Sequence, residues 1–155
     1  MSDSPPQPIF TARDDEGTAH LSGESSQLRL RAEQTDGLFS LTESTLQPGS
    51  EQAPLHMHSR EDETFYVIEG TITAHVGDQT RDLGPGESVW LPRGVPHRIE
   101  ASGGEPVRLL MLIAPAGLER FFEEVDAMHA AGTLDSEAMR ETAARYGITI
   151  IDQND

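Results

Sequence analysis

Four residues with metal-binding side chains stand out in the middle of the chain: His56, His58, Glu63 and His97. Side chains alternate between the two faces of an extended strand, so His56 and His58 point the same way and can offer two imidazoles to one ion. Glu63 begins an apolar run, and His97 follows the turn-rich sequence Pro-Arg-Gly-Val-Pro, which can return a fourth donor to the same place. Three neutral imidazoles and a carboxylate suit a divalent first-row transition metal.

The alternative is that these histidines are ordinary packed or surface residues. An isolated histidine is more often such a residue than a ligand, and His20, His75 and His129 are interpreted in this way. A chance His-x-His pair is disfavoured here, because a carboxylate, a later histidine and two Gly/Pro turns accompany it. The sequence therefore predicts a metal site.

The segments around these four residues resemble the two motifs of the cupin superfamily. The first motif has a glycine, His-x-His, a glutamate and a second glycine, here Gly49, His56, His58, Glu63 and Gly70. The second has a glycine, Pro-x-Gly and a histidine, here Gly86, Pro92, Gly94 and His97. Ala101 stands where an asparagine is usual, and Gly49 lies one residue farther from the first histidine than usual. The resemblance covers roughly residues 37 to 114 and implies that all four ligand positions are filled.

Length and composition set the class of protein. A chain of 155 residues fits one domain with its own core. The absence of cysteine excludes disulfides, thiolate metal sites and cysteine nucleophiles. No apolar stretch approaches the ~20 residues that span a bilayer, and the N-terminus lacks the pattern of a signal peptide. A cytoplasmic location is expected.

The chain is strongly acidic, with 27 acidic and 11 basic residues and a formal net charge of −16. So negative a molecule is not expected to bind nucleic acid or an anionic membrane surface. The expected ligand is a small molecule that is neutral or only weakly charged.

Short strands separated by turn residues dominate the chain from residue 27 onward, and they predict a mainly β fold of two antiparallel sheets, a sandwich or jelly-roll barrel. The expected strands are 28–32, 38–46, 64–69, 71–76, 80–83, 88–91, 97–100 and 107–113. The resemblance makes this barrel, over residues 27–114, the double-stranded β-helix of cupins. Residues 1–26 are expected to be a partly disordered N-terminal arm.

The period of the apolar residues changes after Pro115 and predicts a C-terminal pair of α-helices, at 116–132 and 135–147. The first helix has an apolar face formed by Leu118, Phe121, Phe122, Val125 and Met128, and its acidic residues lie largely on the other face. We expect residues 115–155 to pack on the barrel, rather than to close a pocket or form a dimer contact. The tail from Ile148 is a candidate short strand.

Among cupins, the chain looks most like small quercetin 2,3-dioxygenases, in which a similar helical extension follows the barrel. That resemblance implies an enzyme acting with dioxygen on a flavonol, phenol or enol, with one divalent ion (Ni, Mn, Fe, Co, Cu or Zn) and Glu63 as both ligand and base. A non-oxidative cyclase or isomerase of polyketide-like substrates is the second hypothesis. A non-enzymatic binding protein is the third.

Strand parity gives candidates for the wall of a substrate pocket. If Glu63 faces inward, so do Phe65 and Val67, and Trp90 and Leu112 are further candidates. For each of these apolar residues, a place in the core is the more common role. Exposed sheet edges favour pairing of two barrels, so a homodimer is expected.

Overall fold

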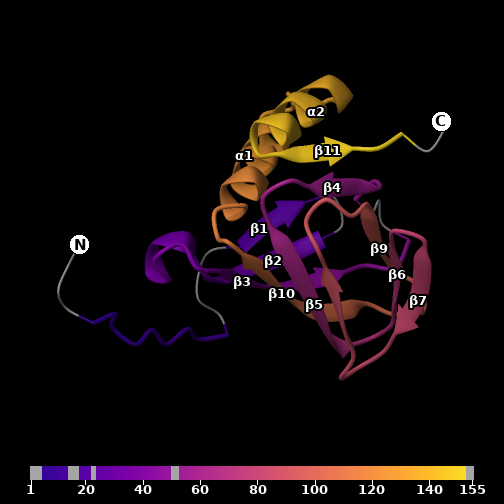
Figure 1. The fold of residues 1–155 in the computed structure, drawn as a ribbon, viewed down its shortest axis with the longest axis horizontal. Coiled ribbons are helices and arrows are strands. Elements are labelled where there is room, and N and C mark those ends of the chain that lie inside the picture. The colour runs from indigo at the N-terminus through magenta and orange to yellow at the C-terminus, as the bar shows by residue number, and fades with distance from the viewer. Residues whose placement is uncertain (1–4, 14–17, 22–23, 50–52, 153–155) are drawn as a thin grey trace.

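The computed structural model describes residues 5–13, 18–21, 24–49 and 53–152, which form two antiparallel β-sheets and two α-helices (Figure 1). The six-stranded sheet has the order β1 (Thr18–Leu21), β2 (Glu24–Leu30), β3 (Ser40–Leu46), β10 (Val107–Ala114), β5 (Asp62–Glu69) and β8 (Ser88–Leu91). The five-stranded sheet has the order β11 (Ile148–Ile150), β4 (His56–His58), β9 (His97–Ala101), β6 (Ile72–Val76) and β7 (Gln79–Leu83). The predicted mainly β, jelly-roll fold is confirmed.

The alternating burial along β3 and β10 shows which face of the six-stranded sheet is internal. Every second residue of β10 is buried, from Val107 to Ile113, and β3 alternates in the same way. Because side chains alternate across a strand, the intervening residues form the outer face of this sheet. The core therefore lies on one side of the sheet.

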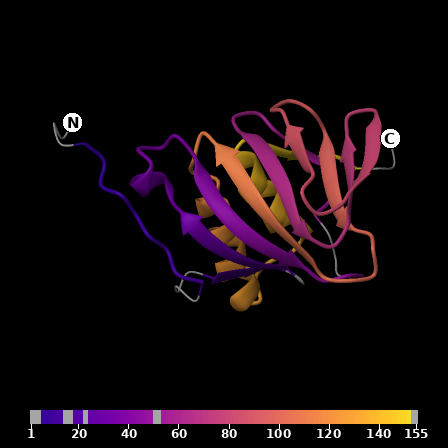
Figure 2. The same ribbon diagram turned by 90° about the horizontal axis from the view of Figure 1, so that it is seen from below.

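Two helices cover part of that inner side: α1 (Glu119–Ala130) and α2 (Ser136–Arg145). Figure 2 shows them behind strands β1 to β3, and α1 contacts β1. Leu118, Phe121 and Val125 are buried in the same apolar cluster as Val67 of β5 and Leu109 of β10. Burial of each such side chain contributes about 1.5–3 kcal/mol. Neither helix of the described residues is long and apolar enough to cross a membrane.

Glu119 departs from the expected polar face of α1, because its side chain is buried. The backbone N–H of Ala32 donates to its Oε1 at 2.7 Å, and that of Gly117 donates to Oε2 at 2.8 Å. Ala32 begins a short 3₁₀ turn (Ala32–Gln34), so the carboxylate ties this turn to the start of the helix. Two amide donors compensate the burial of the charge.

Two segments outside the predicted strands join the sheets. The six-stranded sheet begins at β1, before residue 27, because the polar sequences of β1 and early β2 carry no apolar alternation that would reveal them. At the other end, the tail forms β11, which pairs with β4 in the register Ile148↔His58 and Ile150↔His56. The division of the chain into arm, barrel and extension stays a prediction, with strands starting earlier than expected.

Candidate metal centre

Strand β4 carries His56 and His58 between two other strands of the five-stranded sheet. On one side it pairs with β11, and on the other side His56 pairs with His97 of β9. The residue that pairs with His56 in the sheet is therefore itself a candidate ligand, His97. Two residues that lie 41 positions apart in the sequence are direct neighbours across the sheet.

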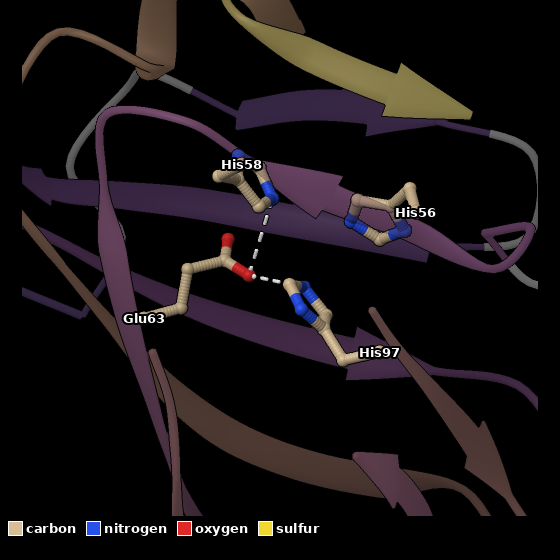
Figure 3. Close-up of side chains that lie close together, drawn as sticks. All are labelled: His56, His58, Glu63 and His97. Atoms are coloured by element: carbon tan, nitrogen blue, oxygen red, sulfur yellow. Dashed lines mark hydrogen bonds and ion pairs between the residues drawn. The ribbon is translucent and has the colours of Figure 1, made fainter. Parts of the chain in front are cut away.

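The four predicted ligands converge. Each of His56, His58, Glu63 and His97 offers one ligand atom, and these atoms all lie within 4.8 Å of one another. Figure 3 shows Glu63 directed from β5 toward the three imidazoles, which come from the opposite sheet. The ring centroid of His56 lies 5.1 Å from that of His58 and 4.5 Å from that of His97. One ion bound by all four donors would require small side-chain adjustments, because metal–nitrogen and metal–oxygen distances are about 2.0–2.2 Å.

Glu63 is the buried carboxylate of the group. Its Oε2 lies 2.9 Å from Nε2 of His97 and 3.4 Å from Nε2 of His58. In the sheet, Glu63 is paired with Ile113 on one side and Leu91 on the other, and both of these side chains are fully buried. The carboxylate thus has apolar neighbours on both flanks and imidazoles in front of it.

Burial and mutual contacts shift the pKa values of this group. Desolvation raises the pKa of Glu63, but the hydrogen bond from His97 and the nearby imidazoles outweigh it, so the net pKa of Glu63 is lowered. Desolvation lowers the pKa of His56 to about 4, which keeps this imidazole neutral at pH 7. Burial also opposes protonation of His58, yet the carboxylates of Glu61 and Glu63 raise its pKa overall. The pKa shifts of Glu63 and His56 thus favour the deprotonated forms that metal binding requires.

The turn before His97 is fixed to the strand that carries the other two histidines. The N–H of Gly94 donates to the carbonyl oxygen of His58 at 2.7 Å. Gly94 has φ of +75°, a conformation that favours glycine. The same turn places the carbonyl of Val95 3.1 Å from Nδ1 of His97, which orients the ring. The turn residues of the second motif thus act by positioning the fourth ligand.

The donor set fits a transition-metal ion. Both ring nitrogens of His58 are buried and make no hydrogen bond with any described residue. Buried polar atoms are normally satisfied, so an unpaired imidazole nitrogen facing a carboxylate and two further imidazoles indicates a missing partner. The residues that would hold the ion are His56, His58, Glu63 and His97, and bound there it would supply Lewis acidity.

The structure separates the four predicted pocket residues. Phe65 and Val67 share the inner face with Glu63; Val67 is fully buried, and Phe65 packs against the core. The expectation that Trp90 and Leu112 line a pocket is corrected. Their side chains are 61% and 38% exposed, and both residues pair with Thr64 on the outer face of the sheet. The residues beside Glu63 are instead their sequence neighbours Leu91 and Ile113. Because apolar residues occupy successive positions in these strands, the sequence does not show which of them face inward.

Residues 42–113 match the family model of the cupin domain. This match runs from strand β3 to strand β10 and supports the resemblance of the barrel to the cupin superfamily. Tetracenomycin polyketide synthase protein TcmJ of Streptomyces glaucescens is 36% identical over 70 residues, which are 45% of this chain and 46% of TcmJ. The match thus spans about half the length of that relative.

Solved structures share the fold. The polyketide cyclase RemF of Streptomyces resistomycificus superimposes with a TM-score of 0.60 and 25% identity, over 72% of this chain and 81% of RemF. A predicted oxalate decarboxylase of Thermotoga maritima has a TM-score of 0.64 and 20% identity, over 69% of this chain and 99% of the other. At that identity the second likeness concerns the fold alone.

Proposed function

We propose that the protein is a metal-dependent enzyme that closes rings in phenolic, polyketide-like molecules without consuming dioxygen. The observation that carries this proposal is the position of Glu63, whose buried carboxylate faces three imidazoles at the inner side of the barrel. A carboxylate in that position can bind the ion or act as a base beside it.

Two comparisons support the proposed substrate class. One relative is a polyketide synthase protein and one structural neighbour at 25% identity is a polyketide cyclase. These likenesses favour the cyclase hypothesis over the quercetinase-like dioxygenase, which stays a weaker alternative. The strongly negative charge of the chain also fits a substrate that is neutral or only weakly acidic.

The residues of the site have separate roles in this reaction. A bound ion would polarise a carbonyl or phenolic oxygen of the substrate. Glu63 accepts the proton from the carbon between two carbonyl groups, and that carbon then forms a bond with a ketone carbon in the same molecule. The proton returns to the new alkoxide, and loss of water completes the ring. Leu91 and Ile113 keep the carboxylate away from bulk water.

The test compares one aromatic polyketone substrate with and without oxygen. Metal-loaded protein is incubated with the substrate in air and under anaerobic conditions, and the masses of the products are measured by mass spectrometry. A product lighter by one water per ring, formed equally in both atmospheres, supports the cyclase. A product that gains oxygen atoms, together with oxygen uptake, overturns it in favour of the dioxygenase.

The Glu63→Gln variant is the matched control, because it keeps the shape of the side chain and removes the base. Turnover is expected to fall about 10²–10⁴-fold in this variant. Turnover equal to that of the wild type would remove Glu63 from the proton transfer. The cytoplasmic location stays a prediction.

A further inference from the structure

Glu61 is a buried carboxylate outside the four candidate ligands. It lies in the bend between β4 and β5 and is 7% exposed. Its Oε2 makes no hydrogen bond with any residue in the described part of the chain, and its nearest recorded polar neighbour is Nδ1 of His58, 3.6 Å away. Burying a carboxylate oxygen without a hydrogen-bond donor is costly, so the contact of Oε2 with His58 is informative.

In His56 and His97, a backbone oxygen lies next to Nδ1 in the position that Glu61 occupies at His58. Nδ1 of His56 lies 2.7 Å from the carbonyl oxygen of Pro54, and Nδ1 of His97 lies 3.1 Å from that of Val95. A carbonyl oxygen can only accept, so in both rings Nδ1 carries a hydrogen, and Nε2 is the nitrogen on the side of the candidate metal site. Each of these rings is therefore oriented by an oxygen on its outer side.

No backbone carbonyl of the described residues accepts a hydrogen bond from Nδ1 of His58. The acceptor nearest to its Nδ1 is the side chain of Glu61, and its Nε2 faces Glu63 at 3.4 Å. His58 is thus the one ring of the three whose outer partner is a charged side chain. The two carboxylates lie on opposite sides of one imidazole.

We propose that Glu61 is a positioning residue for the metal site, which accepts the Nδ1–H of His58 and turns its Nε2 toward the ion. This inference rests on the proposed metal-dependent function. A divalent ion bound by three neutral imidazoles and Glu63 keeps one net positive charge, which the carboxylate of Glu61 balances. Outer carboxylates that orient metal-binding histidines commonly change metal affinity 10–100-fold.

The first experiment measures Zn²⁺ affinity by competition with a chelator in wild type, Glu61→Gln and Glu61→Leu. Gln can still accept from Nδ1 but lacks the charge, and Leu can do neither. We expect affinity to fall in the order wild type, Gln, Leu, with a total loss of about 10–100-fold. Affinities equal within twofold in all three proteins would overturn the proposal.

The matched control is Glu100→Gln. Glu100 also pairs with a histidine, since its Oε2 lies 3.3 Å from Nε2 of His75, but this pair lies on β6 and β9 outside the site. Its loss should leave the Zn²⁺ affinity unchanged. An equal fall in Glu100→Gln would assign the effect to the general charge of the chain and overturn the role of Glu61.

The second readout separates positioning from folding. In protein loaded with ¹¹³Cd²⁺, nitrogen–cadmium couplings in NMR spectra identify which ring nitrogen binds the ion. Wild type should show Nε2 coupling for all three histidines, with a slowly exchanging Nδ1–H on His58 that is lost in Glu61→Leu. Without metal, the Glu61 variants should be as stable to unfolding as the wild type, or more stable, because they lack the buried charge.

The outcomes distinguish this inference from the proposed function. If wild type binds no metal at the four ligands, the proposed function fails. If wild type binds metal and the Glu61 variants bind equally well, only the role of Glu61 fails. A loss of metal-free stability large enough to explain the whole fall in affinity would assign Glu61 to folding and overturn the proposal.

Discussion

Asp62 binds Arg93 through three hydrogen bonds. Its Oδ1 accepts from the backbone N–H of Arg93 at 2.9 Å and from its Nε at 3.0 Å, while Oδ2 accepts from a terminal guanidinium nitrogen at 2.9 Å. Asp62 immediately precedes Glu63, and Arg93 lies in the turn that leads to His97. This pair therefore joins the two segments that carry the carboxylate and the last imidazole.

The first prediction concerns the pH dependence of this link. The side chain of Arg93, and then its backbone N–H, lower the pKa of Asp62 from 3.8 to about 2. A lowered folded-state pKa stabilises the protein above the unfolded value and loses this effect as the pH falls through about 2. Asp62→Asn should lower the unfolding free energy by less than about 1 kcal/mol at pH 7, since the pair is partly exposed.

Urea denaturation of the metal-free proteins between pH 7 and pH 2 checks this. The difference between wild type and Asp62→Asn should be constant down to about pH 4 and shrink below it. Glu105→Gln is the control, because Glu105 is exposed and makes no ion pair with a described residue. A difference that persists unchanged to pH 2 would contradict the role of the carboxylate charge.

The second prediction concerns Gly147, which connects α2 to β11. Its φ is +75°, and an added Cβ would lie 2.6 Å from Oγ of Ser59, so Gly147→Ala adds a steric clash to backbone strain. Gly132 ends α1 with a φ of +70° and has nothing within 4 Å of the same position, which makes Gly132→Ala a matched control for the strain alone.

Both alanine variants should lose about 1–2 kcal/mol from the left-handed backbone. Only Gly147→Ala should also displace β11 from the histidine strand and weaken Zn²⁺ binding. Thermal unfolding and chelator competition measure the two effects. Equal metal affinity in the two variants would show that β11 is not needed to hold β4.

The third prediction tests the corrected parity beside Glu63. Leu91→Ala removes a fully buried side chain next to the carboxylate and should cost about 2–5 kcal/mol, with weaker metal binding. Trp90→Ala, one residue away on the exposed face, should change stability much less and leave metal affinity unaltered. Denaturation and metal titration of the two variants measure these effects. Larger losses in Trp90→Ala than in Leu91→Ala would contradict the placement of Leu91 on the inner face.

The fourth prediction concerns the outer face of the six-stranded sheet. Tyr66, Trp90 and Leu112 are exposed on adjacent strands there, and paired charges such as Arg108 with Glu43 keep the face locally balanced in a chain of net charge −16. The expected homodimer would form through this face, where apolar contact meets little repulsion.

Light scattering should give twice the chain mass for wild type and one chain mass for Trp90→Ser. A wild-type monomer would contradict the homodimer. A Trp90→Ser dimer of unchanged stability to dilution would move the contact to another surface.

The sequence was sufficient to predict that the four candidate ligands come together, because two of them follow from the period of a single strand and the others from turn chemistry. The motif glycines were equally informative. Gly70 has a φ of +82°, and a Cβ there would lie 2.7 Å from the carbonyl oxygen of Pro106, so no other residue fits without displacement. Strand periodicity and turn residues both depend on neighbouring positions in the sequence, so they can be recognised in a single sequence.

Long-range pairing was harder to predict. The run Val-Arg-Leu-Leu-Met-Leu-Ile of β10 is apolar at several successive positions, so its inner face is decided by its register with β5, where Ile113 meets Glu63. Burial of Glu119 and Glu61 was also missed, because each depends on partners outside its own segment's periodic pattern. Neither the amide donors to Glu119 nor the histidine partner of Glu61 can be recognised from hydrophobic periodicity.

The metal content of the purified protein tests the central claim most directly. Elemental analysis after loading with Zn²⁺ and desalting should give about one ion per chain for wild type and almost none for the His58→Ala, His97→Ala double variant, with both proteins folded by circular dichroism. Near-stoichiometric metal retained in the folded double variant would contradict the site formed by His56, His58, Glu63 and His97.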